Sequence, residues 1–208
     1  ASRGYYFGKY GLQALEENGS YAYALNNFSY AVQSLGRDST VTERFSFNVT
    51  DGALNTASTL DIRVSGRNDA PTLVCALSDQ YAPINRSFSW QVPKGSFVDI
   101  DKGDTLDFKA TLADGSPLPA WLNFDAATST FSGVSPKRVE RFLDIRVTAT
   151  DRVAATGSTD GSLSSSDIFR VSFSHGNQGL GNGQDAPPPG HSTNWNDGPG
   201  TYPGNPGV

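Results

Sequence analysis

The stretch "ERFSFNVTDGALNTASTLDIRVSG" at residues 43–66 decides the fold, because apolar and polar residues alternate in two runs that a turn-like segment separates. Strict alternation is typical of a β-strand with one buried face. Asp51, Gly52 and Asn55 supply the turn signal between the runs. The stretch therefore predicts two strands joined by a turn. We expect their buried faces to carry Phe45, Phe47, Val49, Leu60, Ile62 and Val64.

A related pattern closes the second half of the chain. The segments "FLDIRVTATDR" (142–152) and "SDIFRVSFS" (166–174) again give an alternating strand, a Thr-Asp pair, a loop and a final strand. Internal similarity of this kind predicts two related structural units. The boundary between them falls near "NDAP" at residues 68–71.

Further alternating runs extend the β pattern over both halves of the chain. They are "SYAYAL" (20–25), "SFSWQV" (87–92) and "TLDFKATL" (105–112). The segment "WLNFDAATSTFSGV" (121–134) predicts a hairpin around "DAATS". Short strands with frequent turn signals favour two successive β-sandwiches, and hence an all-β protein.

One short helix is predicted between residues 27 and 36. Phe28, Val32 and Leu35 recur at helical spacing, and Gly36 provides a helix stop. We expect one or two helical turns there.

The composition divides the chain into three segments. Residues 1–67 and 68–175 are each expected to form a β-sandwich domain, the first of them truncated at its N-terminus because strand-like sequence follows Ala1 at once. Residues 176–208 consist almost entirely of Gly, Pro, Asn, Asp and small polar residues, which cannot bury a core. This last segment is predicted to be a Gly/Pro-rich tail or linker.

The charge and composition exclude several classes of function. A net charge of -5 and a pI near 4.9 give no electrostatic footprint for nucleic acid. No apolar run is long enough to insert into a membrane. Neither histidine, His175 or His191, has a Ser or Cys partner in a recognisable catalytic arrangement, so we expect no enzyme activity. Cys75 is the single cysteine; it forms no internal disulfide, and we expect it to be buried.

Acidic and amide side chains gather in three places: the connection between the two units, the segment "FVDIDKGDTL", and the end of "VTATD". In a sandwich, a connection and later strand ends can meet at one pole. Ca²⁺ takes six to eight oxygen ligands, largely from carboxylates and carbonyls. Alternatively, Asp and Asn occur there because they stabilise turns. Three clusters at one pole favour the metal, and the candidate ligands are Asn68, Asp69, Asp99, Asp101, Asp104 and Asp151.

Both units resemble known families. The first resembles the VCBS repeat of large bacterial surface proteins, on "YGLQALEENGSYAYALNN" (10–27), "AVQSLG" (31–36), "ERFSFNVTDGA" (43–53) and "LDIRVSGRNDAP" (60–71). The second resembles the dystroglycan-type cadherin-like domain, on "FSWQVPKGSFVDIDKGDTLDFKATLADGSPLPAWLNFDAATSTFSGVSP" (88–136) and "IRVTATD" (145–151). The resemblance implies two tandem Ig/cadherin-like β-sandwiches.

The resemblance also implies a function. Such tandem modules serve adhesion or spacing in bacterial adhesins at the cell surface, in contact with neighbouring repeats of the same chain, and Ca²⁺ rigidifies their junctions. Cadherin-like junctions bind Ca²⁺ through a linker Asn-Asp, an Asp-x-Asp loop and a later Asp. These roles carry onto Asn68, Asp69, Asp99, Asp101 and Asp151. Cadherin linkers have Asp where this chain has Gly66, which favours one or two ions over three.

Two other functions remain open from the sequence. The chain could be a module that binds a cell-surface glycan or protein, or an accessory domain of a secreted hydrolase. Trp121 offers a sugar-stacking platform, but its apolar neighbours favour core packing, as does the alternation around Trp90. The segment "GLGNGQD" (179–185) resembles one calcium β-roll repeat, yet a single copy favours a linker.

Overall fold

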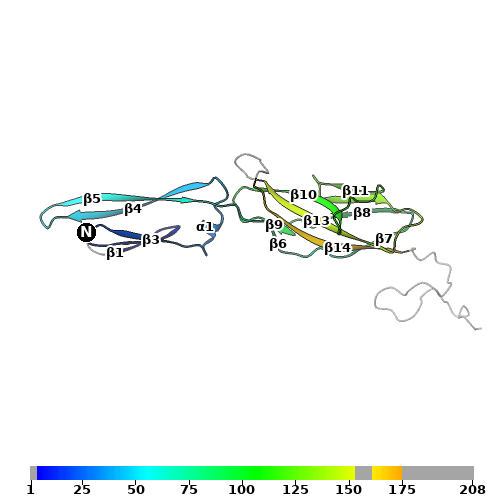
Figure 1. Ribbon diagram of the computed structural model, residues 1–208, viewed down its shortest axis with the longest axis horizontal. Coiled ribbons are helices and arrows are strands. Elements are labelled where there is room, and N and C mark those ends of the chain that lie inside the picture. Colours follow the sequence, from blue (N-terminus) through cyan, green and yellow to red (C-terminus); the bar gives the residue numbers. More distant parts are fainter. Residues whose placement is uncertain (1–3, 153–160, 175–208) are drawn as a thin grey trace, which may run out of the picture.

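The computed structural model describes residues 4–152 and 161–174 of the 208-residue chain. Figure 1 shows two elongated β-rich units arranged end to end, with one short helix close to the place where they meet. The all-β prediction is thereby confirmed. The predicted tail, 176–208, and its "GLGNGQD" segment lie outside the described residues. No helix able to cross a membrane occurs in the described ranges.

The first unit consists of a small sheet and a long hairpin. The sheet contains β1 (Gly4–Phe7), β2 (Gly11–Leu15) and β3 (Tyr21–Leu25), which pair antiparallel in that order. The hairpin contains β4 (Thr40–Thr50) and β5 (Asn55–Ser65), and it lies over one face of the sheet (Figure 1). The stretch that opened the sequence analysis therefore forms this hairpin.

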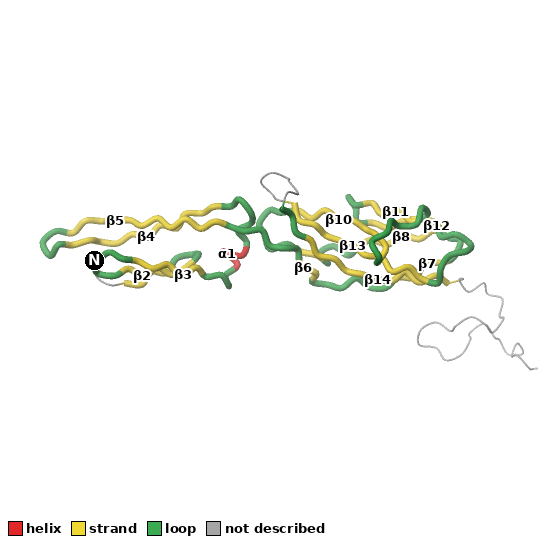
Figure 2. Tube along the Cα trace, viewed as in Figure 1, coloured by secondary structure: helices red, strands yellow, loops and turns green. Residues whose placement is uncertain are grey.

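The hairpin packs on the sheet only along part of its length. Phe45 and Val64 are buried, with 5% and 6% of their surface exposed. Val49 is 42% exposed, so its predicted burial is wrong. The tip of the hairpin extends past the end of the small sheet (Figure 2), and the sheet therefore cannot cover Val49.

Glu43 ties the hairpin to the sheet. Its Oε1 accepts a hydrogen bond from the Tyr10 amide at 3.0 Å, and its Oε2 accepts one from the Tyr23 hydroxyl at 2.7 Å. Burial, followed by the hydrogen bond and charge of Glu43, raises the pKa of Tyr23. A carboxylate at this buried position is thus supported by two donors from the facing sheet, as buried charges require.

The helix α1 spans Tyr30–Gln33, within the predicted range. Ser29 is its N-cap, and the Ser29 side chain accepts a hydrogen bond from the Val32 amide. The expected apolar stripe is wrong at Phe28, which is fully exposed. Phe28 precedes the cap residue and is therefore outside the helix.

The second unit contains two sheets. Their orders are β10-β13-β14-β7 and β11-β12-β8, and a short pair of strands, β6 and β9, flanks them. The strand β7 pairs parallel with β14, and all other pairs are antiparallel. The strands are β6 (Thr72–Leu73), β7 (Gln80–Pro83), β8 (Ser87–Gln91), β9 (Phe97–Val98), β10 (Thr105–Leu112), β11 (Leu122–Asp125), β12 (Thr130–Val134), β13 (Phe142–Arg152) and β14 (Ser164–Ser174).

An aromatic cluster fills the space between these two sheets. Phe131 and Phe169 are almost completely buried, and the Trp90 ring contacts both at centroid distances of 5.9 and 4.6 Å. Trp121 packs edge-on against Phe173 at 5.6 Å. Both tryptophans therefore belong to the core, as the sequence predicts.

Cys75 is exposed, so its predicted burial is wrong. It lies in the irregular segment between β6 and β7, where Leu77 is the buried residue.

We expect Phe131→Ala to destabilise the second unit by about 3–5 kcal/mol, because it empties the centre of the aromatic cluster. Chemical denaturation followed by tryptophan fluorescence measures the loss. Tyr81→Ala, at a residue that is 76% exposed, is the matched control and should change the free energy of unfolding by less than about 0.5 kcal/mol. Equal effects of the two substitutions would contradict this description of the core.

Candidate functional site

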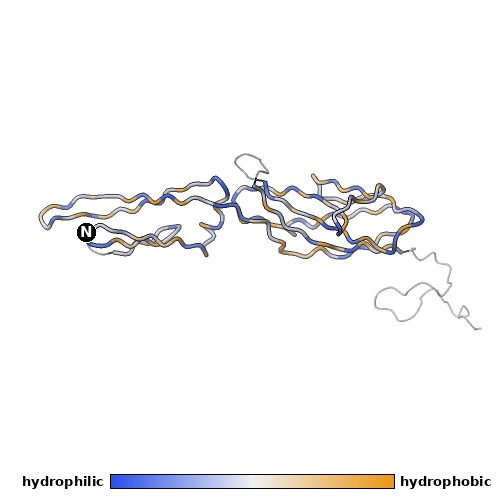
Figure 3. Tube along the Cα trace, in the orientation of Figure 1, coloured by the Kyte–Doolittle hydropathy of each residue, from blue (hydrophilic) through white to orange (hydrophobic). Residues whose placement is uncertain are grey.

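The six predicted ligands all lie where the two units meet. Asn68 and Asp69 belong to the connection between β5 and β6, three others to the turn between β9 and β10, and Asp151 to the end of β13. Figure 3 shows a hydrophilic stretch of chain at this place. We refer to them as the junction cluster, which consists of Asn68, Asp69, Asp99, Asp101, Asp104 and Asp151.

The turn after β9 is folded around its own carboxylates. The Asp101 amide donates a hydrogen bond to Asp99 Oδ1 at 2.8 Å, and the Asp104 amide donates one to the Asp101 carbonyl at 3.3 Å. Gly103 has a φ of 93°, a conformation that glycine adopts without strain. The Asp-x-Asp sequence thus makes the curved loop that the ligand prediction requires.

Two hydrogen bonds join the connection to the second unit. Asn68 Nδ2 donates to Asp151 Oδ2 at 2.8 Å, and the Asp69 amide donates to Asp101 Oδ2, also at 2.8 Å. Asp151 also accepts from the Leu163 amide and is completely buried. Residues far apart in the sequence are therefore in direct contact at this junction.

The first unit also contacts the junction, through residues that the sequence analysis missed. The Lys102 amide donates to the Ser34 carbonyl at 3.1 Å, which links the acidic turn to the end of α1. A Cβ atom added to Gly36 would lie 3.1 Å from Asp101 Cβ. Because Ser34 and Lys102 interact through backbone atoms, their side-chain types gave no signal in the sequence.

Gly66 is constrained by the same packing. Its amide donates to the Ser39 carbonyl at 2.8 Å, and the next amide, of Arg67, donates to the Leu35 carbonyl at 3.0 Å. A Cβ on Gly66 would lie 2.0 Å from the Leu35 carbonyl oxygen. No side chain fits here without a backbone shift, which explains why this connection has no aspartate at the first cadherin-linker position.

The junction carboxyls raise each other's pKa values. Burial is the largest cause for Asp101, and the charges of Asp99, Asp69 and Asp104 add to it; together they raise the pKa of Asp101 to about 6, although the Asp69 amide opposes the rise. Burial, followed by the charges of Asp151, Asp104 and Asp69, raises the pKa of Asp99. Negative charge is thus held at this site against an electrostatic cost.

Several buried oxygens of the cluster lack a hydrogen-bond donor in the described structure. They are Asn68 Oδ1, Asp99 Oδ2 and Asp101 Oδ1. Buried polar atoms are normally paired, and an unpaired one points to a missing partner. Within the described ranges, no three acidic, histidine or cysteine side chains already stand as a ready metal group. Small side-chain movements would thus have to accompany any cation that these oxygens accept.

Comparisons with known proteins agree with this fold. Residues 70–166 match the model of a family described as "Putative Ig domain". Among curated proteins, no sequence matches the chain. The match and the described strands together show an Ig/cadherin-like sandwich in the second unit.

Cadherin domains are among the similar solved structures. Drosophila N-cadherin EC1–4 is 9% identical, with 81% of this chain and 40% of that chain covered and a TM-score of 0.49. Human CDH23 EC21–23 is 14% identical, with 78% and 50% covered and a TM-score of 0.49. Protocadherin gamma C5 EC1–3 is 12% identical, with 83% and 55% covered and a TM-score of 0.48. The chain thus spans about half the length of these proteins or less.

In the presence of a chelator, we expect the second unit to be more stable near pH 4.5 than near pH 7.5 as far as Asp101 contributes. Its folded pKa is raised to about 6 from an ordinary value of 3.8. The contribution is therefore fully present below about pH 4 and is lost as the pH rises through about 6. Allowing for solvent screening, it amounts to on the order of 1–2 kcal/mol.

Urea unfolding of the parent and of Asp101→Asn, measured across this pH range in chelator, isolates the contribution of this one carboxyl. The difference in unfolding free energy between the two proteins should change with pH. A constant difference would show that Asp101 does not titrate as described.

Gly66→Ala should destabilise the protein by about 1–3 kcal/mol, because its Cβ would overlap the Leu35 carbonyl. The neighbouring exposed substitution Ser65→Ala is the control and should be nearly neutral. Thermal melting compares the two, and a neutral Gly66→Ala would refute the close approach.

Proposed function

We propose that this chain is a calcium-binding, extracellular adhesion and spacer module of a large bacterial surface protein, in which Ca²⁺ rigidifies the junction between the two units. One observation carries the proposal. Buried carboxylate and amide oxygens without donors lie where the connection meets the second unit, and their charges raise the pKa values of Asp99 and Asp101. A bound cation would satisfy these oxygens and neutralise the charge.

The donor set suits Ca²⁺ by its chemistry. It contains carboxylate and amide oxygens and no thiolate or imidazole, and hard divalent cations prefer such oxygens. Asn68 adds a neutral oxygen where another carboxylate would increase the repulsion. The residues that would hold the ion are Asn68, Asp69, Asp99, Asp101, Asp104 and Asp151. Gly66 leaves the set without a further linker carboxylate, so we infer one or two ions.

The proposed mechanism is mechanical and involves no catalysis. Without cation, like charges at the junction repel, and the hydrogen bonds from Asn68 and Asp69 are the contacts through which the connection holds these carboxylates. The ion supplies positive charge at that point. Ligands from the connection and from two segments of the second unit would then be held together, which fixes the direction in which one unit leaves the other.

Two further points support a surface role. The single cysteine rules out an internal disulfide staple, so a metal at the junction is a physically sensible substitute in a calcium-rich medium. Trp121 lies in the core against Phe173, which removes it as an exposed sugar platform. We infer neighbouring repeats of the same chain as the immediate partners.

We expect Ca²⁺ to raise the melting temperature of the second unit by several degrees, and chelator to reverse the rise. Extracellular sites often bind with a Kd of about 10⁻⁴–10⁻³ M. At ten times the Kd, one site stabilises the folded state by about 1.4 kcal/mol, and at a hundred times by about 2.7 kcal/mol. Differential scanning fluorimetry across a Ca²⁺ titration measures the shift.

Asp101→Ala should remove most of this shift, because it deletes a buried ligand. Asp61→Ala is the matched control: it deletes an exposed carboxylate that pairs with Arg44 on the hairpin, and it should leave the calcium shift intact. Small-angle scattering should show a more extended particle with Ca²⁺ than with chelator. If Ca²⁺ alters neither melting nor shape, the proposal fails.

A further inference from the structure

The sheet of the first unit has an outer face, directed away from the hairpin, that is apolar throughout. Strand register places two rows of residues side by side on it, Phe7–Leu12–Ala24 and Tyr5–Ala14–Ala22. No charged or hydrogen-bonding side chain interrupts these rows except for the Tyr5 hydroxyl. We call the outer face the set Tyr5, Phe7, Leu12, Ala14, Ala22 and Ala24.

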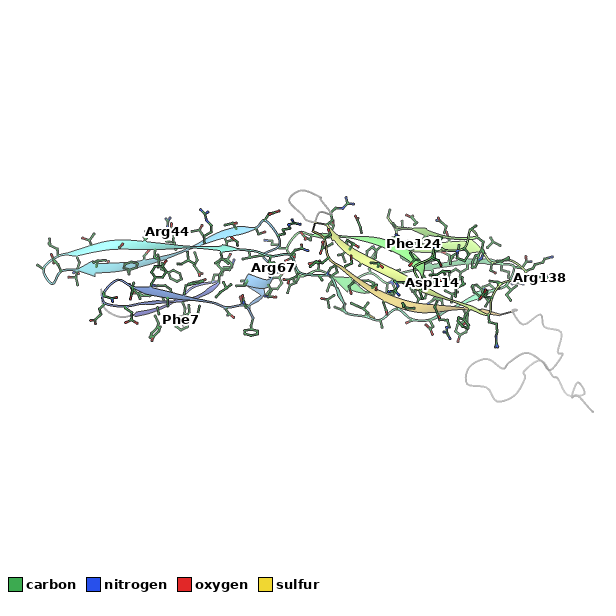
Figure 4. All side chains as sticks on the ribbon, viewed as in Figure 1. Phe7, Arg44, Arg67, Asp114, Phe124 and Arg138 are labelled. Atoms are coloured by element: carbon green, nitrogen blue, oxygen red, sulfur yellow. The ribbon has the colours of Figure 1, made fainter. Side chains whose placement is uncertain are left out.

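This outer face is open to solvent. The hairpin packs on the other face of the sheet, where Gln13 and Leu15 are buried. Figure 4 shows Phe7 directed away from β4 and β5. Phe7 is 86% exposed and Tyr5 58%. Monomeric proteins rarely expose contiguous apolar surface of this kind without a binding role.

The shape of the outer face is stepped. Its large side chains, Tyr5 and Phe7, are on β1, and its smallest, Ala22 and Ala24, are on β3. The middle strand, β2, carries Leu12 and Ala14 in register with them. One edge of the face is therefore raised and the opposite edge is low.

We propose that the outer face binds the outer face of a second copy of this chain. A two-fold axis along β2 would place β1 of one copy over β3 of the other. Phe7 would then lie over the partner's Ala24, Tyr5 would lie over the partner's Ala22, and Leu12 would meet its own equivalent at the axis. Each raised edge fills the other copy's low edge, and the contact is isologous, as two-fold dimers require.

A second copy fits this surface better than an unrelated ligand for a steric reason. The step is complementary to itself, and uncharged apolar rows can stack as the inner faces of a β-sandwich do, at about 10 Å separation. The face is small, well below the roughly 800 Å² per partner of a stable interface, so the dimer is weak. Several copies of the module side by side would multiply such contacts.

Sedimentation velocity from about 10 µM to about 1 mM protein, in about 0.15 M salt, tests the proposal. We expect a monomer–dimer equilibrium with a Kd of about 10⁻⁴ M, equal in Ca²⁺ and in chelator. Phe7→Ala should weaken it at least tenfold. Tyr81→Ala, an exposed aromatic substitution in the second unit, should leave it unchanged.

An exchange of side chains tests the arrangement itself. Adding Ala24→Phe to Phe7→Ala restores a large residue opposite a small one, so the double variant should recover to within about threefold of the parent Kd. Adding Ala22→Phe to Phe7→Ala instead puts the new ring opposite the partner's Tyr5, and it should not recover. Circular dichroism verifies that all variants are folded.

Three results would overturn the proposal. They are a chain that stays monomeric to 1 mM, a dimer that Phe7→Ala does not weaken, and equal rescue by Ala24→Phe and Ala22→Phe. The calcium-dependent melting shift concerns the other end of the first unit, so failure here leaves the proposed junction function standing, and the reverse also holds.

Discussion

Repulsion between buried carboxylates at the junction is the constraint on which the rest of the structure depends. Asp101 is 4% exposed and Asp151 is completely buried, although each carries a negative charge when ionised. Amide donors from Asp69 and Leu163 offset part of this cost, and the side chain of Asn68 offsets more. The connection is therefore held against the second unit by the same groups that make the site anionic.

Backbone packing sets how closely the two units approach this charge. Gly66 and Gly36 allow the end of α1 to contact the connection and Asp101, and the Lys102 amide completes the contact at Ser34. A connection of Gly and Ser could be equally short, but it would supply none of the acceptors and donors found at Asn68 and Asp69. The junction thus combines close steric packing with an unfavourable charge that a cation would relieve.

Alternation of apolar residues was sufficient to predict the β-strands, because each buried face leaves a period-two pattern in the sequence. It could not predict how far a neighbouring sheet extends, and Val49 and Phe28 therefore turned out exposed. The junction residues were predictable as a set because Asp and Asn recur after strand ends. Contacts made by backbone atoms, such as Ser34 with Lys102, leave no residue-type signal, and the role of Gly66 emerged only from its distance to Leu35.

The parallel pairing of β7 with β14 has a consequence for force. The chain enters the second unit at the junction, and β14 ends at Ser174 near the opposite pole (Figure 1). Tension along the long axis would pull these two strands in opposite directions along their shared ladder, from Val171 with Gln80 to Ser174 with Pro83. All four residue pairs would bear the load together in shear, whereas an antiparallel hairpin pulled at its open end separates one pair at a time.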